Sequence, residues 1–299
     1  PTFRTHRTLF GRFRLLLTST SPITHHPSSK HGAIDLPHRS SDEMILLLVC
    51  FLSFSTTLRR PVFGARVLST WEQCGTDPFF QQVIDTVDKV FDALPPSRNI
   101  LNVPEHQRES LGVAKIVSRR LSAMQRNKDC PRCWLQAAHC ICSQTTRSIE
   151  DSLPHFVHRV FLILNHKEIG MVVDTAKLLL MSMPNQARLV VSGIAEDYQE
   201  SLVELKDALQ QKERPCIVLF PTEDAQTFED LYQSTISSKR DDASATDTKL
   251  DVVVIDGTWQ QAQKIHQRYI PAVQDGGPCR VCLSDAALEL LGGGGGGGG

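Results

Sequence analysis

The stretch "VVVIDGTWQQAQKIHQRYIP", residues 252–271, predicts a strand, a tight turn and a helix in direct succession. Residues 252–255 form a continuous β-branched run, which is typical of a strand buried on both faces of a parallel sheet. Thr258 is followed three residues later by a glutamine, which is the spacing of a capping box, so the helix is predicted to begin at Trp259. Pro271 then ends the helix, because proline cannot continue it.

The turn between this strand and this helix carries an acid, a glycine and an indole. Asp256 is an acceptor that could orient a substrate or take a proton. Gly257 has no Cβ and permits a close approach of the backbone to a ligand, and Trp259 offers a flat face for stacking on a nucleobase. Because open α/β sheets place ligands at the carboxyl ends of their strands, this turn is a candidate site. A buried tryptophan beneath a capped turn is the alternative.

The rest of the chain alternates between strand and helix patterns from residue 160 onward. Strands are predicted at 160–164, 188–192 and 216–220, and helices at 174–184, 196–212 and from Glu223, capped by Thr222, to about residue 236. Two amphipathic helices, 77–94 and 105–127, precede them. This alternation predicts an α/β fold with a mostly parallel sheet and helices on both faces.

A cysteine cluster, "CPRCWLQAAHCIC", occupies residues 130–142. Cys130 and Cys133 have the Cys-x-x-Cys spacing that lets both thiolates reach one metal from a tight turn, and Cys140 and Cys142 supply a second pair. Four thiolates with no open position form a closed, structural zinc site, so a Cys-rich zinc-binding segment is predicted ahead of the sheet. The alternatives are reduced thiols without a metal, and His139 as a replacement ligand.

Composition places the chain among soluble globular proteins. Its hydrophobic fraction is 41% and its charged fraction 22%. A net charge of −1 gives no overall signature of a nucleic-acid binder, but it is compatible with a local basic patch. The apolar run at residues 44–55 is too short to span a bilayer, so no membrane association is expected. Residues 1–34 contain no acid, which is typical of a transit peptide. An untranslated region that was read as coding sequence fits this composition equally well.

The order of these motifs resembles the DTW-domain family over roughly residues 128–283. The resemblance rests on the two cysteine pairs followed by "NHKE", "DTAKLL", "LFPTEDA" and "IDGTWQQA". Members of that family are transferases that move the 3-amino-3-carboxypropyl group of S-adenosylmethionine to N3 of a uridine in tRNA. The family is similar to a superfamily of knotted methyltransferases. The resemblance therefore implies a SPOUT-like fold, and whether this fold carries a knot stays open.

The resemblance also implies roles for individual residues. Asp256 is the expected catalytic residue, accepting or relaying the uridine N3 proton, and the cysteines are the structural zinc ligands. The loop "NHKE" departs from the family's His-Pro-x-Glu pattern at Lys167, which replaces a proline. The expected cofactor-binding residues are Gly257, Thr258, Trp259, His166, Glu168 and Thr175.

Domain boundaries follow from the same comparison. We expect a leader or targeting segment at 1–75, a helical region at 76–128, the DTW domain at 129–291 and a glycine tail at 292–299. The family pattern continues into a Tyr-Arg-x-Arg stretch where this chain has glycines, so a truncated domain is expected. Two other functions stay open: aminocarboxypropyl transfer to ribosomal RNA, and zinc-stabilised RNA binding without catalysis. The oligomeric state and the compartment (cytoplasm, nucleus or an organelle) also stay open.

Overall fold

The computed structural model describes residues 77–94, 100–142, 157–171, 176–211, 214–231, 249–272 and 278–284. Those up to Cys282 belong to one compact unit, Pro61–Cys282. The predicted leader at 1–75 and the glycine tail at 292–299 lie outside the described residues. Within the described ranges, no helix has both the length and the apolar character needed to cross a bilayer.

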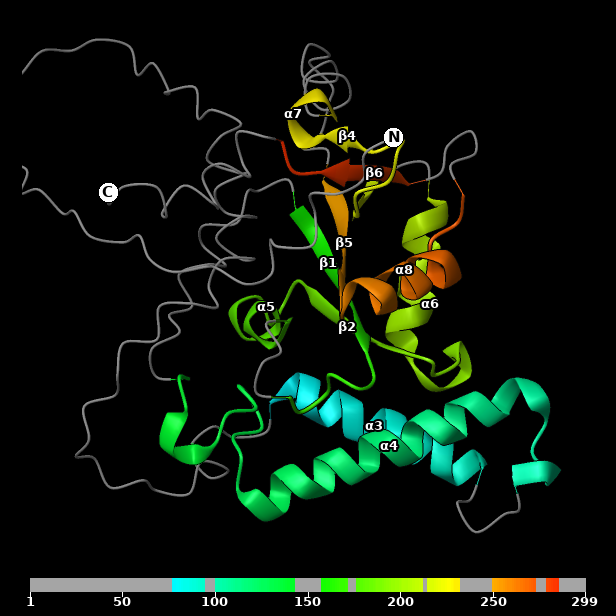
Figure 1. The fold of residues 1–299 in the computed structure, drawn as a ribbon, viewed down its shortest axis with the longest axis vertical. Helices are drawn as coiled ribbons and strands as arrows, with labels where there is room; N and C mark the ends of the chain where they lie inside the picture. The colour runs from blue at the N-terminus through cyan, green and yellow to red at the C-terminus, as the bar shows by residue number, and fades with distance from the viewer. Residues whose placement is uncertain are drawn as a thin grey trace, which may run out of the picture. The chain divides into compact units, whose positions relative to one another are not determined.

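A six-stranded parallel sheet forms the centre of this unit (Figure 1). The strand order is β2-β1-β5-β3-β6-β4, so β1 and β5 are interior neighbours. Leu164 of β1 lies opposite Asp256 of β5, which brings the loop after β1 beside the turn after β5. The strands are β1 (Val157–Asn165), β2 (Ala187–Ser192), β3 (Cys216–Leu219), β4 (Gln226–Thr227), β5 (Leu250–Asp256) and β6 (Cys279–Cys282).

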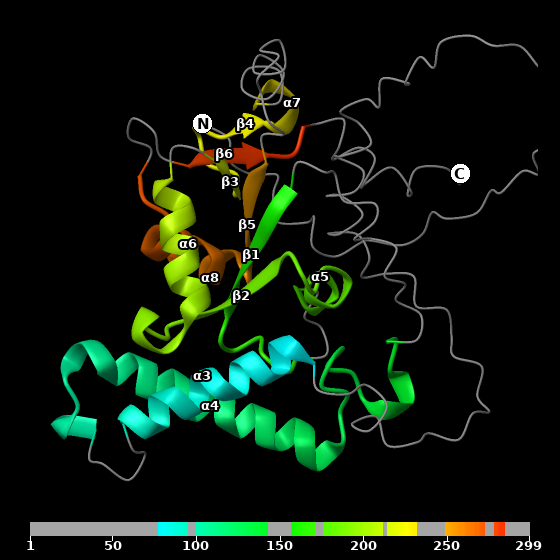
Figure 2. The same ribbon diagram turned by 180° about the vertical axis from the view of Figure 1, so that it is seen from behind.

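Helices cover both faces of the sheet, as the alternating pattern predicts. Figures 1 and 2 place α6 (Glu200–Gln210) and α8 (Trp259–Tyr269) on one side of β1, and α5 (Ala176–Ser182) on the other. The core beneath α6 and α8 joins the apolar faces of these helices to the inner strands. Its members include Phe161, Ile163, Leu205, Val218, Val253, Ala262 and Ile265.

The N-terminal helices α3 (Pro78–Ala93) and α4 (Glu105–Asn127) pack together beneath the sheet in Figure 1. Ser110 of α4 accepts a hydrogen bond from the Ala195 backbone N–H at 3.0 Å, just after β2. Gln82 of α3 donates to the Leu189 carbonyl of β2 at 3.0 Å. The pair therefore borders the carboxyl ends of the strands, where ligand sites are expected.

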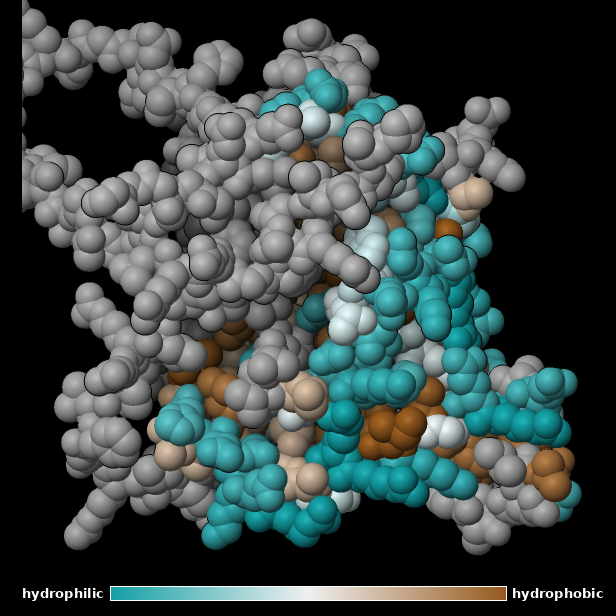
Figure 3. Space-filling model, viewed as in Figure 1, coloured by the Kyte–Doolittle hydropathy of each residue, from teal (hydrophilic) through white to brown (hydrophobic). Residues whose placement is uncertain are grey.

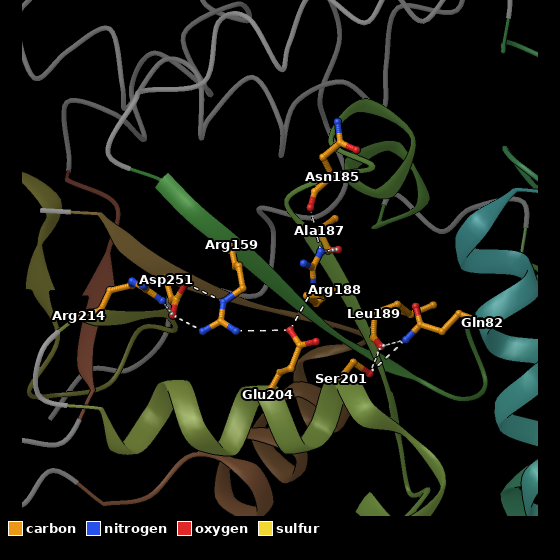
Figure 4. Close-up of polar contacts among 10 residues, drawn as sticks. All are labelled: Gln82, Arg159, Asn185, Ala187, Arg188, Leu189, Ser201, Glu204, Arg214 and Asp251. Atoms are coloured by element: carbon orange, nitrogen blue, oxygen red, sulfur yellow. Dashed lines mark hydrogen bonds and ion pairs between the residues drawn. The ribbon is translucent and has the colours of Figure 1, made fainter. Parts of the chain in front are cut away.

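A buried ion network fastens α6 to the sheet (Figure 4). Asp251 of β5 is 1% exposed and accepts hydrogen bonds from Arg159 of β1 at 2.8 and 3.2 Å. Arg159 and Arg188 both reach Glu204 of α6, at 3.4 and 3.1 Å, and Arg214 lies 3.7 Å from Asp251. The hydrogen bond to Asp251 raises the pKa of Arg159. Removing one partner of the buried Arg159–Asp251 pair, which joins β1 to β5, would cost about 3–5 kcal/mol. Glu204, which is partly exposed, links α6 to Arg159 and Arg188 of the sheet.

Two predicted helices differ from the structure. The helix predicted at 196–212 is a 3₁₀ turn, Glu196–Tyr198, followed by α6 from Glu200. The break falls at Gln199, whose side chain accepts from the Val191 N–H at 2.9 Å and donates to the Val191 carbonyl at 3.0 Å. These bonds hold Gln199 in an extended conformation against β2.

The helix predicted from Glu223 is also wrong at its start. Residues 223–224 form a turn, Gln226 and Thr227 form β4, and α7 (Phe228–Leu231) begins only afterwards. β4 pairs with β6, and this pairing holds its backbone extended. Thr227, and not Thr222, caps the helix, because its hydroxyl accepts from the Asp230 N–H at 3.2 Å.

Candidate functional site

The turn between β5 and α8 has a fixed geometry. The Thr258 hydroxyl accepts from the Gln261 N–H at 3.4 Å, and the Gln261 side chain accepts from the Thr258 N–H at 2.7 Å. This is the predicted capping box. Gly257 has φ +152°, and a Cβ there would lie 3.1 Å from Gln261 Oε1. Glycine is therefore required for the turn to close onto its own helix cap.

Asp256 is the last residue of β5 and is half-buried. Its Oδ2 accepts a hydrogen bond at 3.2 Å from the backbone N–H of Ala176, the first residue of α5. The acid is thus held by a helix that lies on the opposite face of the sheet from α8. This bond fixes the orientation of the group, and the other carboxylate oxygen has no hydrogen-bond partner among the described residues.

Three rings stack beside this turn. The Phe220 ring, just after β3, lies 5.4 Å from the Trp259 ring at an interplanar angle of 6°. It lies 4.4 Å from the His266 ring at 13°. Trp259 and His266 are seven residues apart on α8, about 10.5 Å, so Phe220 lies between them. Trp259 is 49% exposed, so the stack holds an indole at the surface beside Asp256.

Burial has the largest effect on the pKa of His266, the titratable ring of the stack. Desolvation lowers the pKa of His266, the cation of Arg280 lowers it further, and Asp224 partly opposes both. The imidazole Nε2 is buried and has no hydrogen-bond partner in the described residues. His266 therefore contributes to the site as a neutral aromatic ring.

The loop after β1 carries the second group of predicted residues. His166 Nδ1 lies 3.1 Å from the Ser192 carbonyl. A carbonyl only accepts, so Nδ1 carries the hydrogen and Nε2 is the acceptor nitrogen. Burial lowers the pKa of His166, and the nearby Lys167 adds to this effect. Glu168 is half-buried on the same loop, and its N–H donates to the Asn165 carbonyl at 2.8 Å.

The structure brings the turn and the loop together at the carboxyl edge of the sheet. A Cβ at Gly257 would lie 3.5 Å from the Cβ of Asn165, the residue before His166. His166 faces β2 through Ser192, whereas Trp259 faces β3 through Phe220. The predicted residues therefore follow the edge from β2 to β3. Thr175 lies outside the described residues.

The four cysteine sulfurs lie within 4.8 Å of one another. The Cys130 and Cys142 sulfurs are 3.6 Å apart, and those of Cys133 and Cys140 are 3.8 Å apart. Sulfurs bound at about 2.3 Å to a tetrahedral zinc lie about 3.8 Å apart, so the cluster fits that ion. Hydrogen bonds from the other three thiols lower the pKa of Cys130, which favours a thiolate there. His139 is exposed and does not belong to the cluster.

The cysteine segment joins α4 to α5. Lys128, in the left-handed conformation with φ 59°, caps α4 two residues before Cys130. Cys130 and Cys133 pack on Met181 of α5, and Arg132 donates to the Met181 carbonyl at 3.3 Å. The cluster therefore supports the helix whose first N–H holds the candidate catalytic acid.

Some residues of the site escaped the sequence patterns. The Tyr269 hydroxyl accepts from the Gly193 N–H at 2.8 Å, which ties the end of α8 to the end of β2. Phe220 and His266 form the ring stack. His266 and Tyr269 lie seven and ten residues after Trp259, on one side of α8, and this spacing was the only local signal. Their partners on β2 and β3 are distant in sequence.

Comparison with known proteins agrees with this arrangement. A family model described as the DTW domain matches residues 127–285, more than half of the 299-residue chain. No curated protein and no protein of solved structure matches the chain significantly. The matched residues include the cysteine cluster, the sheet and the Asp256–Trp259 turn. The chain belongs to the DTW-domain family.

Proposed function

We propose that this protein transfers the 3-amino-3-carboxypropyl group of S-adenosylmethionine to N3 of a uridine in tRNA. Membership of the DTW-domain family supports a transferase that modifies tRNA. The observation that carries the proposal is the turn after β5: Asp256 and an exposed Trp259 lie three residues apart at the carboxyl end of an interior strand. An oriented acid and an exposed ring are what proton removal and base stacking require.

In the proposed reaction, uridine N3 loses its proton to the Asp256 carboxylate and attacks the γ-carbon of the donor. The N–C bond forms as the C–S bond breaks, and the sulfur keeps the electron pair, which releases 5′-methylthioadenosine. Transfer of this group instead of the methyl depends on which carbon is presented in line. Orientation of this kind can supply about 7–11 kcal/mol of the barrier reduction.

The remaining residues of the edge suit the binding of the donor and the base. Trp259 provides a stacking face, and Gly257 allows a ligand to approach the backbone closely. On the loop after β1, the Glu168 carboxylate complements the ammonium of the transferred group, and neutral His166 offers Nε2 as an acceptor. The Thr258 hydroxyl is engaged in the capping box, so Thr258 supports the turn through the cap.

We further propose that the four cysteines hold a structural zinc. Zinc in a Cys₄ site has no open position and fixes the fold around it. Its proposed role is to hold α5 against the sheet and so to keep Ala176 in contact with Asp256. A SPOUT-like path for the chain is part of the same proposal. Its knot depends on the connections 232–248 and 273–277, which lie outside the described residues.

An Asp256→Asn variant tests the reaction. Asparagine keeps an acceptor for the Ala176 N–H but cannot take the uridine proton, so we expect turnover to fall about 100-fold or more while donor affinity is retained. Unmodified tRNA is incubated with the donor, and aminocarboxypropyl-uridine is measured by nucleoside mass spectrometry. Asp207→Asn, on the exposed face of α6, is the matched control. Full turnover by Asp256→Asn would remove this residue from catalysis.

The same assay separates the alternatives. Modification of ribosomal RNA but not tRNA would change the substrate while keeping the donor and the chemistry. Binding of tRNA without any mass shift, at saturating donor, would identify a non-catalytic RNA-binding protein.

A further inference from the structure

The solvent face of α4 is basic and contains no acid over half of its length. Residues 115–128 contain two lysines and three arginines and no aspartate or glutamate, although the whole chain has a net charge of −1. Lys115, Arg119 and Arg126 lie at positions i, i+4 and i+11. At 100° per residue these positions differ by no more than about 40° around the helix axis. They form one stripe about 16 Å long.

These cations have no side-chain partner among the residues that the structure describes. In the part of the chain that the structure describes, Lys115, Arg119, Arg120 and Arg126 make no ion pair and no side-chain hydrogen bond. Arg119 and Arg126 are exposed. Other arginines of the fold do have partners: Arg159 pairs with the Asp251 carboxylate, and Arg280 donates to the Pro278 carbonyl. The cations of the stripe are therefore available to bind a partner outside the chain.

The inner face of α4, the helix that carries the stripe, borders the candidate site. A Cβ at Gly170, on the loop after β1, would lie 2.6 Å from Met124 of α4 and 4.0 Å from Arg120. A Cβ at Gly193, after β2, would lie 2.8 Å from Val113 and 3.7 Å from His166. α4 is thus in direct contact with the two loops that carry the polar groups of the edge.

The exposed side of α8 continues the acid-free surface. α8 contains no aspartate or glutamate, and its exposed positions are Trp259, Gln260, Gln263, Lys264, Gln267 and Arg268. Arg268 forms an ion pair with Glu109 of α4, which joins the two helices. Figure 1 shows α4 in front of α3 and α8 in front of α6, and Figure 2 shows the reverse. Both helices therefore lie on one side of this unit, and Figure 3 shows that face as mostly hydrophilic, with a hydrophobic patch within it.

We propose that the solvent faces of α4 and α8 form an RNA-binding surface, on which the phosphate backbone lies along Lys115, Arg119 and Arg126 while a base reaches Trp259. The inference rests on the proposed function, because it names where the RNA substrate would bind. A row of cations with neutral amide donors beside it suits a phosphate backbone, and an exposed indole suits an unstacked base. A membrane is a poorer fit, because α4 exposes no large hydrophobic side chain among its described residues.

The test is the triple variant Lys115→Gln/Arg119→Gln/Arg126→Gln in the full chain. Glutamine is a comparable helix former, so the melting temperature should stay within a few degrees. A tRNA transcript is titrated at several salt concentrations by fluorescence anisotropy. Each lost phosphate contact reduces the slope of log K against log salt by about 0.7–0.9, so we expect the slope to fall by about 2 to 3. Affinity at about 0.1 M salt should fall at least tenfold.

The matched control removes three other exposed cations: Lys89→Gln/Lys206→Gln/Lys249→Gln. Lys89 and Lys206 lie on α3 and α6, and Lys249 precedes β5. The control has the same net charge as the variant and should retain the wild-type slope. Wild-type affinity in the α4 variant, or an equal loss in the control, overturns the proposal. So does binding of phosphatidylserine vesicles that exceeds tRNA binding per phosphate and is lost in the α4 variant.

The measurements also separate this proposal from the proposed function. Donor affinity, measured by calorimetry with S-adenosylmethionine, should be unchanged in the α4 variant, because no residue of the turn is altered. In turnover, KM for tRNA should rise while kcat at saturating tRNA is retained. If wild-type protein binds tRNA through α4 but never modifies it, the surface stands and the proposed function fails. If it modifies tRNA with the same KM in the α4 variant, the surface fails and the function stands.

Discussion

Gly257 is the residue of the Asp256–Trp259 turn whose backbone conformation is least favourable for a residue with a side chain. Its φ of +152° is rare for residues with a side chain, and a Cβ would lie 3.1 Å from Gln261 Oε1 of the cap, which is closer than an ordinary van der Waals contact. The residue therefore links the shape of the turn to the start of α8. A side chain here would have to displace the cap or move the backbone, and either change would shift Asp256 and Trp259.

We expect Gly257→Ala to destabilise the protein by about 1–3 kcal/mol, because alanine is strained in this conformation and pushes on the capping box. Chemical denaturation measures the effect. Gly112→Ala in α4 is the control: a Cβ there meets nothing within 4 Å, so it should stabilise by about 0.4–1 kcal/mol. Equal stability of the two variants would contradict this account of the turn.

At the scale of elements, α5 connects the cysteine cluster to the turn after β5. It has seven residues, which is too short for a stable isolated helix, so it depends on its contacts. Met181 packs on the cysteines, and the N–H of Ala176 binds Asp256. A change at the cysteine cluster would therefore reach Asp256 through one helix.

We expect the purified protein to contain one zinc ion per chain, and chelation to lower its melting temperature and its turnover. The loss of turnover follows because α5 no longer holds Asp256. Native mass spectrometry counts the metal. Cys133→Ser should lose the zinc, whereas Cys279→Ser, on β6 and outside the cluster, should retain it. A protein that is free of zinc and unaffected by chelators would contradict the assignment.

The elements that the sequence predicted are those set by local patterns. The amphipathic helices α3 and α4, the apolar strand β5 and the capped start of α8 all agree with the structure. β4 and β6 were missed, because two and four residues are too few to show an alternation. Their conformation comes from pairing with each other and with β3. The break before α6 was also missed, because it depends on hydrogen bonding of the Gln199 side chain to β2, eight residues earlier.

The candidate site shows the same division. Asp256 through Trp259 could be read from sequence because strand, turn and cap are adjacent in the chain. The ring stack could not, because Phe220 lies 39 residues before Trp259 and meets it only through the parallel pairing of β3 with β5. The tautomer of His166 likewise depends on Ser192, which belongs to another strand.

At the scale of the whole molecule, three partly buried histidines are expected to make stability depend on pH. Burial lowers the pKa of His158, His166 and His266 in the folded protein. The unfolded chain, with a histidine pKa of about 6.5, then binds more protons than the folded chain near pH 6. The free energy of unfolding should therefore fall as pH decreases through about 6.5, and this contribution should level off below the folded-state pKa values.

We expect His266→Phe to reduce this pH dependence. Phenylalanine keeps the stack on Phe220 and cannot be protonated, so one of the contributions disappears. Urea unfolding measured at intervals from about pH 7.5 to 5 gives the free energy for both proteins. Their difference should change in favour of the variant as pH falls. A constant difference across this range would show that His266 does not titrate between the two states.

The left-handed residue that ends α4 has a consequence for regulation. Lys128 ends α4 two residues before Cys130, so the basic helix leads directly into the cysteine segment. We expect a polyanion that immobilises α4 also to restrain the cysteines, and a metal held by the cysteines to restrain α4. Thermodynamic linkage then requires each ligand to change the affinity of the other by the same factor. Nucleic-acid binding and metal binding would then be coupled, so the concentration of one ligand would affect the occupancy of the site for the other.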